Sequence, residues 1–300
     1  FLCRVRPNSK GMGMMCKKEL QEGMGRLEQP VLPLIGMVQF LFLTGDFATV
    51  DEVICQMPPD IVTAFATYTD PVALLQPYAD LLQPLIALKA GQVPPQTVVD
   101  LNHTPVDALT ATTAMVTQTV LSRELEQINS ALCAPCGCTL CCVGPDTAMK
   151  QRFFEIPLQP DEVDRFSSLL CIDTPISRST RSNDEPALQV QQTDFYHQPD
   201  PLLLHWQTGW SLVLPTSSRC PHLEKEGRCR IYPDRPQVCR RPQIFPYVVE
   251  PIESKGQQLY RLRNALLAVI DCPYVRLMQE EISAYAAACE LEMVFRQNKG

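Results

Sequence analysis

The ten residues "CAPCGCTLCC", from Cys133 to Cys142, place five cysteines in one short stretch of a 300-residue chain. The chain holds 14 cysteines in all, a smaller fraction than in small secreted proteins built on disulfides. A chain of this length with 45% hydrophobic residues buries a sizeable core, so it does not need disulfides in order to fold. Clustered thiols in such a chain are typical of metal ligands.

The spacing of these cysteines indicates how they could bind. Cys133 and Cys136 form a C-x2-C pair, which lets one turn of backbone present two sulfurs to a single ion or cluster. Cys141 and Cys142 are adjacent, and in extended backbone adjacent side chains point to opposite faces. We therefore expect this pair to serve two metals, or one metal and a separate role. With the cysteines further along the chain, the pattern is compatible with two zinc ions, one iron–sulfur cluster with spare thiols, or two clusters.

Three cysteines stand alone in apolar stretches, and we predict that Cys55, Cys171 and Cys289 are buried structural thiols. Of the four histidines, His222 alone is close enough to a clustered cysteine in sequence to be a candidate ligand. The other three are expected at the solvated surface.

The second cysteine-rich stretch, "CPHLEKEGRCRIYPDRPQVCR", runs from Cys220 to Arg240. Together with "CAPCGCTLCC" it resembles the YkgJ-type cysteine-cluster family, a zinc- or iron-chelating domain with a CxxCxxxCC motif that also includes flagellin lysine-N-methylases. The resemblance covers about residues 130 to 275. The matching positions are Cys133, Cys136, Gly137, Cys141, Cys142, Cys220, Pro221, Leu223, Cys229, Ile231, Tyr232, Arg235, Pro236, Cys239, Arg240, Cys272 and Pro273.

Two departures from the family pattern affect the ligand set. Cys136 is followed by Gly-Cys-Thr-Leu before the adjacent pair, a longer run than usual, so Cys138 could replace a neighbour as ligand. Phe245-Pro246 also arrives later after Cys239 than is usual in the family. The predicted metal ligands are Cys133, Cys136, Cys141, Cys142, Cys220, Cys229, Cys239 and Cys272.

Arginines accompany the downstream cysteines. Arg235 and Arg240 match the family pattern, and a four-thiolate site is negatively charged. Guanidinium groups can donate hydrogen bonds to sulfur or to nearby carbonyls and offset that charge. We therefore predict that both arginines face the metal centre.

The rest of the chain predicts a helix-rich α+β protein. Residues 1–25 are expected to be an N-terminal segment of disordered or undefined structure. Residues 26–130 are apolar and broken by proline, which favours a bundle of short helices. Residues 131–300 are expected to form a small, irregular cysteine-cluster domain with short strands and a C-terminal helix over about residues 275–296.

Individual helices can also be placed. Asp70-Pro71 and Thr104-Pro105 each put an N-capping residue before a proline, which predicts two helix starts. The second helix should run to about Leu132 and bury a stripe that begins at Leu121. The segment 174–201 is polar and lacks periodicity, so we expect a surface loop.

Composition limits the partners. A net charge of −7 argues against general nucleic-acid binding, which needs a broad basic surface. The apolar stretch Val31–Leu43 is too short to span a bilayer and contains proline and glycine, so we expect a buried helix and no transmembrane segment. A cytoplasmic location is expected, with a protein partner bound through the N-terminal helices.

The expected function is metal binding, with an iron–sulfur cluster that serves electron transfer, redox chemistry or the structure of a complex. A structural zinc site in an interaction module is the alternative. The family resemblance adds a second alternative, transfer of a methyl group from S-adenosylmethionine to lysine, although no glycine-rich nucleotide loop is present. Redox sensing by a thiolate that lies beside an arginine is a third alternative.

Overall fold

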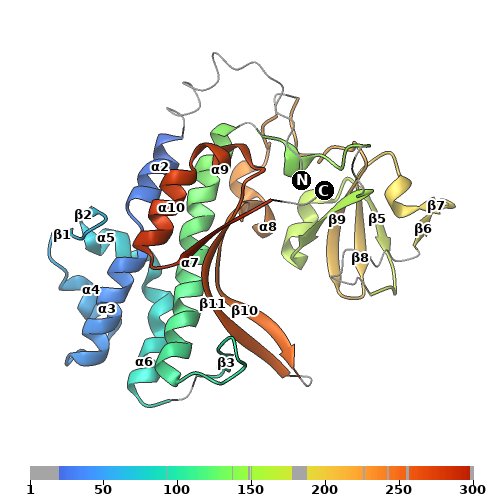
Figure 1. The fold of residues 1–300 in the computed structure, drawn as a ribbon. Coiled ribbons are helices and arrows are strands. Elements are labelled where there is room, and N and C mark those ends of the chain that lie inside the picture. Colours follow the sequence, from blue (N-terminus) through green and yellow to red (C-terminus); the bar gives the residue numbers. More distant parts are fainter. Residues whose placement is uncertain are drawn as a thin grey trace. The chain divides into compact units, whose positions relative to one another are not determined.

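The computed structural model of the chain describes residues 20–92, 94–136, 138–147, 149, 151–177, 188–225, 227–241, 243–254 and 257–297. These residues have a mixed α+β structure that divides into two compact units (Figure 1). Of the described residues, those between 133 and 241 form the cysteine-rich unit, and residues 20–132 together with 243–297 form the helical unit. The packing therefore places the C-terminal segment with the N-terminal helices, whereas the expectation from sequence had grouped it with the cysteines.

Short helices and one small hairpin form the first part of the helical unit. Asp70 caps the first turn of one helix by accepting a hydrogen bond from the backbone N–H of Ala73 at 3.2 Å, so this predicted helix start is confirmed. Pro77 and Pro84 then divide the following stretch into three short pieces, as expected. These elements are α2 (Gln21–Glu28), α3 (Leu32–Thr44), α4 (Val50–Cys55), β1 (Asp60–Val62), β2 (Thr67–Thr69), α5 (Pro71–Leu75), η1 (Gln76–Leu82) and α6 (Gln83–Lys89).

The central element is the long helix α7 (Ala108–Cys136). Its predicted start at Pro105 is wrong by three residues, because Asp107 caps the helix by accepting from the N–H of Thr110 at 2.9 Å. The predicted apolar stripe is confirmed, since Leu121, Leu125, Ile128 and Leu132 are all buried. The last turn of α7 carries Cys133 and Cys136.

The C-terminal segment of the helical unit forms a sheet that packs beside α7 (Figure 1). β10 (Ile244–Ser254) and β11 (Gln257–Val269) form an antiparallel hairpin, and β3 (Val98–Val99) and β12 (Glu292–Arg296) pair in parallel with β11. Gln118 on α7 accepts hydrogen bonds from the N–H groups of Val248 and Val249, where the register of the hairpin shifts. The side chain thus satisfies backbone donors at an irregular point of the sheet.

The predicted C-terminal helix is present but shorter than expected. α9 (Pro273–Leu277) and α10 (Gln279–Ala288) end before Glu290, whose backbone adopts a left-handed conformation with φ of 57°. The chain then continues as β12 rather than as helix. The expectation of helix up to Arg296 is therefore wrong, because pairing with β11 decides the conformation of this segment.

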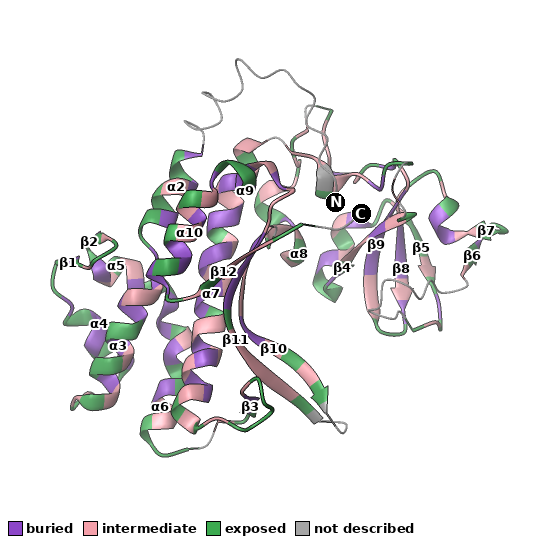
Figure 2. Ribbon diagram, viewed as in Figure 1, coloured by how far each residue is buried: buried purple, intermediate pink, exposed green. Residues whose placement is uncertain are grey.

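The buried side chains show which elements of the helical unit pack against one another (Figure 2). Its main core joins α3, α4, the β1–β2 hairpin, α5 to α6 and the middle of α7. Leu34, Ile35, Val38 and Phe42 of α3 are buried in this core. By length and composition the stretch from Gln21 to Thr44 could also cross a membrane, a test that buried helices of soluble proteins pass as well.

A four-stranded sheet organises the cysteine-rich unit, in the order β4-β9-β8-β5. Apolar clusters cover both of its faces. The segment after β4 is the 3-10 helix η3, and β6, β7 and η4 occupy part of the expected loop 174–201, of which residues 178–187 lie outside the described residues. The elements are η2 (Leu140–Cys142), β4 (Phe153–Leu158), η3 (Pro160–Phe166), β5 (Leu170–Asp173), β6 (Gln189–Val190), β7 (Thr193–Asp194), η4 (Phe195–His197), β8 (Leu202–Trp206), β9 (Gly209–Pro215), η5 (Tyr232–Asp234) and α8 (Gln237–Arg240).

Candidate metal centre

The adjacent cysteines lie in the short 3-10 helix η2 rather than in extended backbone. In this conformation the Sγ atoms of Cys141 and Cys142 are 3.9 Å apart, and both residues line the same cavity. Two sulfurs bound tetrahedrally to one zinc ion at about 2.3 Å would be roughly 3.8 Å apart. The premise of extended backbone is therefore wrong, and the expectation of two metals, or of one metal and a separate role, loses that support.

Close backbone packing fixes the position of this pair. The N–H of Cys220 donates to the carbonyl of Cys142 at 2.8 Å, which brings the two cysteine-rich stretches together. Gly144 follows the pair, and a Cβ atom there would lie 1.8 Å from the carbonyl oxygen of Pro215. Any side chain at this position would force the loop away from the end of β9. Glycine is thus required for the contact between the first cysteine loop and the sheet.

A tight loop carries the next two cysteines. Cys220 and Cys229 flank a turn in which Leu223 and Cys229 form an isolated β-bridge. Gly227, inside this turn, has a positive φ of 86°, a conformation that other residues adopt only with strain. The turn lets two cysteines nine positions apart line one cavity.

Cys239 lies on the short helix α8, and a buried carboxylate holds the start of this helix. Glu162 accepts from the N–H of Gln237 at 2.7 Å and from the N–H of Gln159 at 2.9 Å. One side chain therefore caps both η3 and α8. Glu162 therefore links the segment that follows the first cysteine-rich stretch to the helix that carries Cys239.

Seven cysteines line one cavity of about 190 Å³ within this unit. Apolar side chains, among them Phe166 and Leu212, complete its walls. The cysteines are Cys133, Cys138, Cys141, Cys142, Cys220, Cys229 and Cys239. None of the seven forms a disulfide.

The structure thus brings six of the eight predicted ligands together and places two elsewhere. Cys136, at the end of α7, does not line the cavity, whereas Cys138 does. Cys272 is buried in the helical unit, where it precedes the first turn of α9. Cys138 is the cavity residue that the predicted set omitted, although the longer spacing before the adjacent pair had pointed to it.

Burial and mutual repulsion keep most of these thiols protonated. Burial, with the negative charge of Cys141 and Cys220 as a smaller cause, raises the pKa of Cys239 to about 12. Burial also raises the pKa of Cys133 to about 11. The contact between the adjacent cysteines lowers the pKa of Cys141 and raises that of Cys142. Binding of a cation would remove the repulsion and release protons.

The predicted arginines occupy different positions. Arg235 is buried and lines the cavity; its Nε donates to the carbonyl of Tyr232 at 3.1 Å, and its guanidinium lies 3.7 Å from the centre of the Tyr232 ring. Its charge also lowers the pKa of Cys133, although burial of this thiol is the larger effect. Arg240 lies at the end of α8 and is not among the cavity residues.

His222 is buried, and protein groups engage both of its ring nitrogens. Nε2 lies 2.7 Å from the carbonyl oxygen of Arg165, to which it donates, and Nδ1 accepts from Arg230 at 3.2 Å. With neither nitrogen directed at a metal, His222 acts as a structural link between η3 and the Cys220–Cys229 loop.

The isolated cysteines differ from one another. Cys289 is buried, as predicted, but Cys55 and Cys171 are exposed. Cys55 ends the short helix α4, and Cys171 lies on the edge strand β5, so the apolar sequence around each does not cover its thiol.

The donor set fits a thiophilic metal. Cysteine sulfurs are the ligands that zinc and iron–sulfur centres use, seven cysteines line this cavity, and a buried guanidinium can offset part of their charge. Within the described residues, however, no three Cys, His, Asp or Glu side chains stand close enough to bind one ion as they are arranged.

Comparisons with known proteins agree with this chemistry. A sequence model described as "CxxCxxCC: putative zinc- or iron-chelating domain" matches residues 132–289, more than half of the chain. Neither the curated proteins nor the solved structures include a match. The matched range contains all of the cavity cysteines as well as Cys272. The chain therefore belongs to the CxxCxxCC family of zinc- or iron-chelating domains, the cysteine-cluster family that its sequence resembles.

Proposed function

We propose that the protein holds an iron–sulfur centre in the cysteine-lined cavity and uses it for electron transfer or to stabilise a complex. The main observation in support of this proposal is the volume of the cavity. About 190 Å³ remains between the seven thiols, roughly the volume of six water molecules. Four thiolates hold either a single zinc ion or one iron–sulfur cluster, but a cluster of several iron and sulfide ions also needs room between them.

Two further features support a buried cluster. The walls are largely apolar, which limits access of water to the thiolates. Arg235 supplies a positive charge inside the walls. We place this protein in the cytoplasm, since a reducing compartment keeps such thiols available for metal.

Structural zinc is the second candidate. The distance of 3.9 Å between the sulfurs of Cys141 and Cys142 suits two ligands of one tetrahedral zinc ion. In that case the metal would contribute folding free energy to the cysteine-rich unit rather than redox chemistry.

Anaerobic purification followed by metal and sulfide analysis separates the two candidates. We expect brown protein with iron and acid-labile sulfide in equal amounts, and broad visible absorption that dithionite bleaches. Colourless protein with stoichiometric zinc would favour the second candidate. Protein that binds neither metal, even after anaerobic reconstitution, would contradict both.

Matched cysteine variants locate the ligands in the same assay. Cys239→Ala should lower the metal content, whereas Cys55→Ala should not, because Cys55 is exposed in the other unit. Cys138→Ala should lower it more than Cys136→Ala, because only Cys138 lines the cavity. A larger loss of metal in Cys136→Ala than in Cys138→Ala would indicate that the C-x2-C pair, Cys133 and Cys136, supplies ligands.

A further inference from the structure

The helix α3 in the helical unit is apolar on more sides than the chain covers. Its core face is buried, yet Met37, Phe40 and Leu41 are 40%, 66% and 39% exposed. A helix that is hydrophobic all round is normally buried on all sides. One face of α3 therefore lacks a partner among the described residues of this chain.

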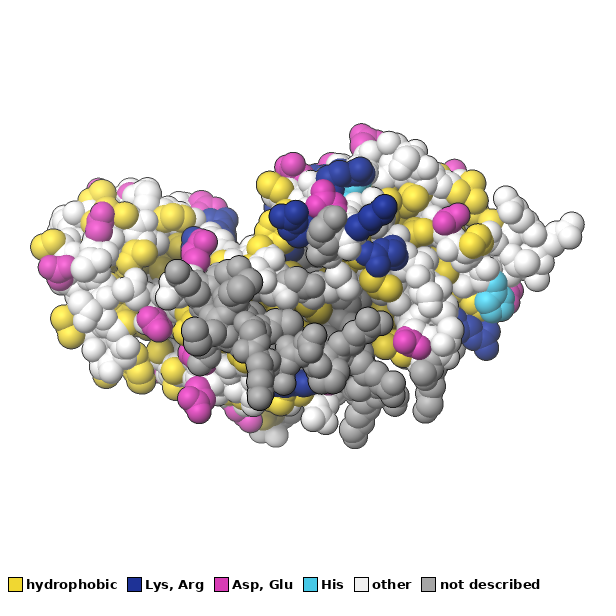
Figure 3. Space-filling model, turned by 90° about the horizontal axis from the view of Figure 1, so that it is seen from above, with side chains coloured by type: hydrophobic (Ala, Val, Ile, Leu, Met, Phe, Trp, Pro, Cys, Tyr) yellow, Lys and Arg dark blue, Asp and Glu magenta, His cyan; other side chains and the backbone are white. Residues whose placement is uncertain are grey.

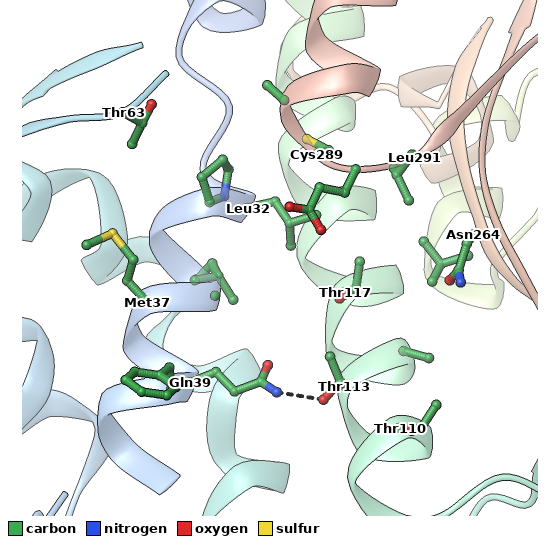
Figure 4. Close-up of a pocket in the computed structure, with 18 of the residues that line it drawn as sticks. Leu32, Met37, Gln39, Thr63, Thr110, Thr113, Thr117, Asn264, Cys289 and Leu291 are labelled. Carbon is green, nitrogen blue, oxygen red and sulfur yellow. Dashed lines mark hydrogen bonds between the residues drawn. The ribbon is translucent and has the colours of Figure 1, made fainter. Parts of the chain in front are cut away.

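Residues of α3 and α7, together with Phe65 in the turn between β1 and β2, line one groove of about 910 Å³. Met37 lies on the side of α3 away from α7, whereas Gln39, on the other side, donates to the hydroxyl of Thr113 on α7 at 2.6 Å and joins the two helices (Figure 4). Of the ten exposed large hydrophobic residues in the described part of the chain, five line this groove. They are Met37, Phe40, Leu41, Phe65 and Leu109. Such a concentration marks an interaction site.

The dimensions of the groove fit a peptide segment. Its wall on α3 runs from Leu32 to Leu41, which at 1.5 Å per residue is about 14 Å. This length accommodates between two and three turns of a second helix. Helix-in-groove recognition uses such a surface, with apolar residues of the partner spaced three and four positions apart.

The charge around the groove decides what kind of segment it fits. Residues 31–122 contain eight Asp or Glu residues, no arginine and one lysine, Lys89. The Lys89 ammonium is occupied, because it donates to the carbonyls of Phe42, Gly45 and Phe47 at the end of α3. Among the groove residues the one charged side chain is Glu290. On the face seen in Figure 3, Lys and Arg gather mainly over the cysteine-rich unit, whereas acidic side chains are scattered over both units.

We propose that this groove docks an amphipathic helix of a partner protein whose apolar stripe is flanked by Lys and Arg. The exposed apolar side chains bind the stripe, and the acidic surroundings attract the flanking cations and raise the rate of association. The same charge repels an anionic membrane surface and a second copy of this face. The groove lies in the helical unit, so the proposal does not depend on which metal the cysteines bind.

A pair of designed peptides tests the proposal on the full chain with its metal in place. The probe is a fluorescein-labelled 18-residue helix with leucine at positions spaced three and four apart and lysine elsewhere; its partner has glutamate in place of lysine. Fluorescence anisotropy should show saturable binding of the lysine peptide that weakens as salt is added. The glutamate peptide should bind at least tenfold more weakly.

Substitutions locate the binding. Phe40→Gln should weaken binding of the lysine peptide at least tenfold, and Phe65→Gln, from a different element, should act in the same direction. Leu101→Gln is the matched control, because Leu101 is also 66% exposed in this unit and does not line the groove. All three side chains are exposed, so the variants should keep the circular dichroism of the wild type.

Four results would overturn the proposal. They are equal binding of both peptides, binding that Phe40→Gln and Phe65→Gln leave unchanged, a Phe40-dependent dimer in sedimentation, and Phe40-dependent binding to vesicles of phosphatidylglycerol. The last two would assign the groove to a second copy or to a membrane.

Discussion

At the residue scale, Arg235 is a buried cation of the cysteine-lined cavity. It lines the cavity and stacks on Tyr232. Burial raises the pKa of the Cys133 thiol, whereas the charge of Arg235 and a hydrogen bond from it lower that pKa by less. Thiolates bound to a metal would place further negative charge near this guanidinium.

Arg235→Ala should therefore weaken metal retention, by about ten- to a hundred-fold in affinity, as is usual when a group that supports metal ligands is lost. The measurement is the rate at which a chelator removes metal, together with the helical circular dichroism, which should persist. Arg235→Lys should recover part of the retention by keeping the charge without the planar donors.

The exposed Arg241 offers the control for this substitution, since it lies in the same stretch. Arg241→Ala should retain metal like the wild type. If Arg235→Ala did so too, the guanidinium would be a packing residue with no influence on the centre.

At the scale of elements, α7 organises the helical unit through buried polar side chains as well as through its apolar stripe. Asn129 donates to the carbonyl of Ile244 at 2.6 Å and accepts from the hydroxyl of Tyr274 at 2.7 Å. Glu124 accepts from the hydroxyl of Tyr285 and from the N–H of Val31. These contacts tie β10, α9, α10 and the start of α3 to one helix.

Glu124 makes the stability of this arrangement depend on pH. Burial is the main cause that raises its pKa to about 7; the bonds from Tyr285 and Val31 and the charge of Arg26 act in the opposite direction. The folded protein therefore binds this proton more tightly than the unfolded chain does. The resulting stabilisation is present below pH 4.5 and is lost as the pH rises to about 7.

Relative to Glu124→Gln, which cannot ionise, the wild type should lose on the order of 3 kcal/mol in the free energy of unfolding between pH 4.5 and 8. Urea unfolding followed by circular dichroism at both pH values measures this difference. Glu126→Gln, two positions along the same helix, serves as the control. A difference that does not change with pH would show that Glu124 stays ionised in the folded protein.

At the scale of the whole molecule, the two units depend on different sources of stability. The helical unit has an apolar core that extends from α3 to α7. The cysteine stretches of the other unit are held by turns, isolated β-bridges and short helices around the cavity. Metal binding should therefore contribute folding free energy to the cysteine-rich unit in particular.

Removal of the metal by an anaerobic chelator should raise hydrogen exchange in peptides that cover residues 133–147 and 219–241. Exchange in residues 31–90 should stay unchanged, because their protection rests on apolar packing. Mass spectrometry of the full chain resolves both regions in one sample. A uniform increase would indicate that the chain unfolds as a single cooperative unit.

The sequence by itself determined the features that depend on neighbours along the chain. The stripe of α7 follows from local periodicity, and the breaks at Pro77 and Pro84 follow from the lack of a proline N–H. The spacing of the cysteines also indicated the family and identified six of the seven thiols that line the cavity. Sequence spacing is informative there because the tight turns around Gly144 and Gly227 use few residues.

Only the tertiary structure decided the rest. Cys138 lines the cavity while Cys136 does not, because Cys136 still belongs to the last turn of α7 and Cys138 lies beyond the helix. Residues 243–297 pack with the N-terminal helices because Gln118 and Asn129 of α7 bind their backbone, and a residue-by-residue pattern does not reveal such distant partners. The groove beside α3 also could not be predicted from the sequence. Phe40 and Phe42 are the same residue type two positions apart, and only the packing of α3 makes the first exposed and the second buried.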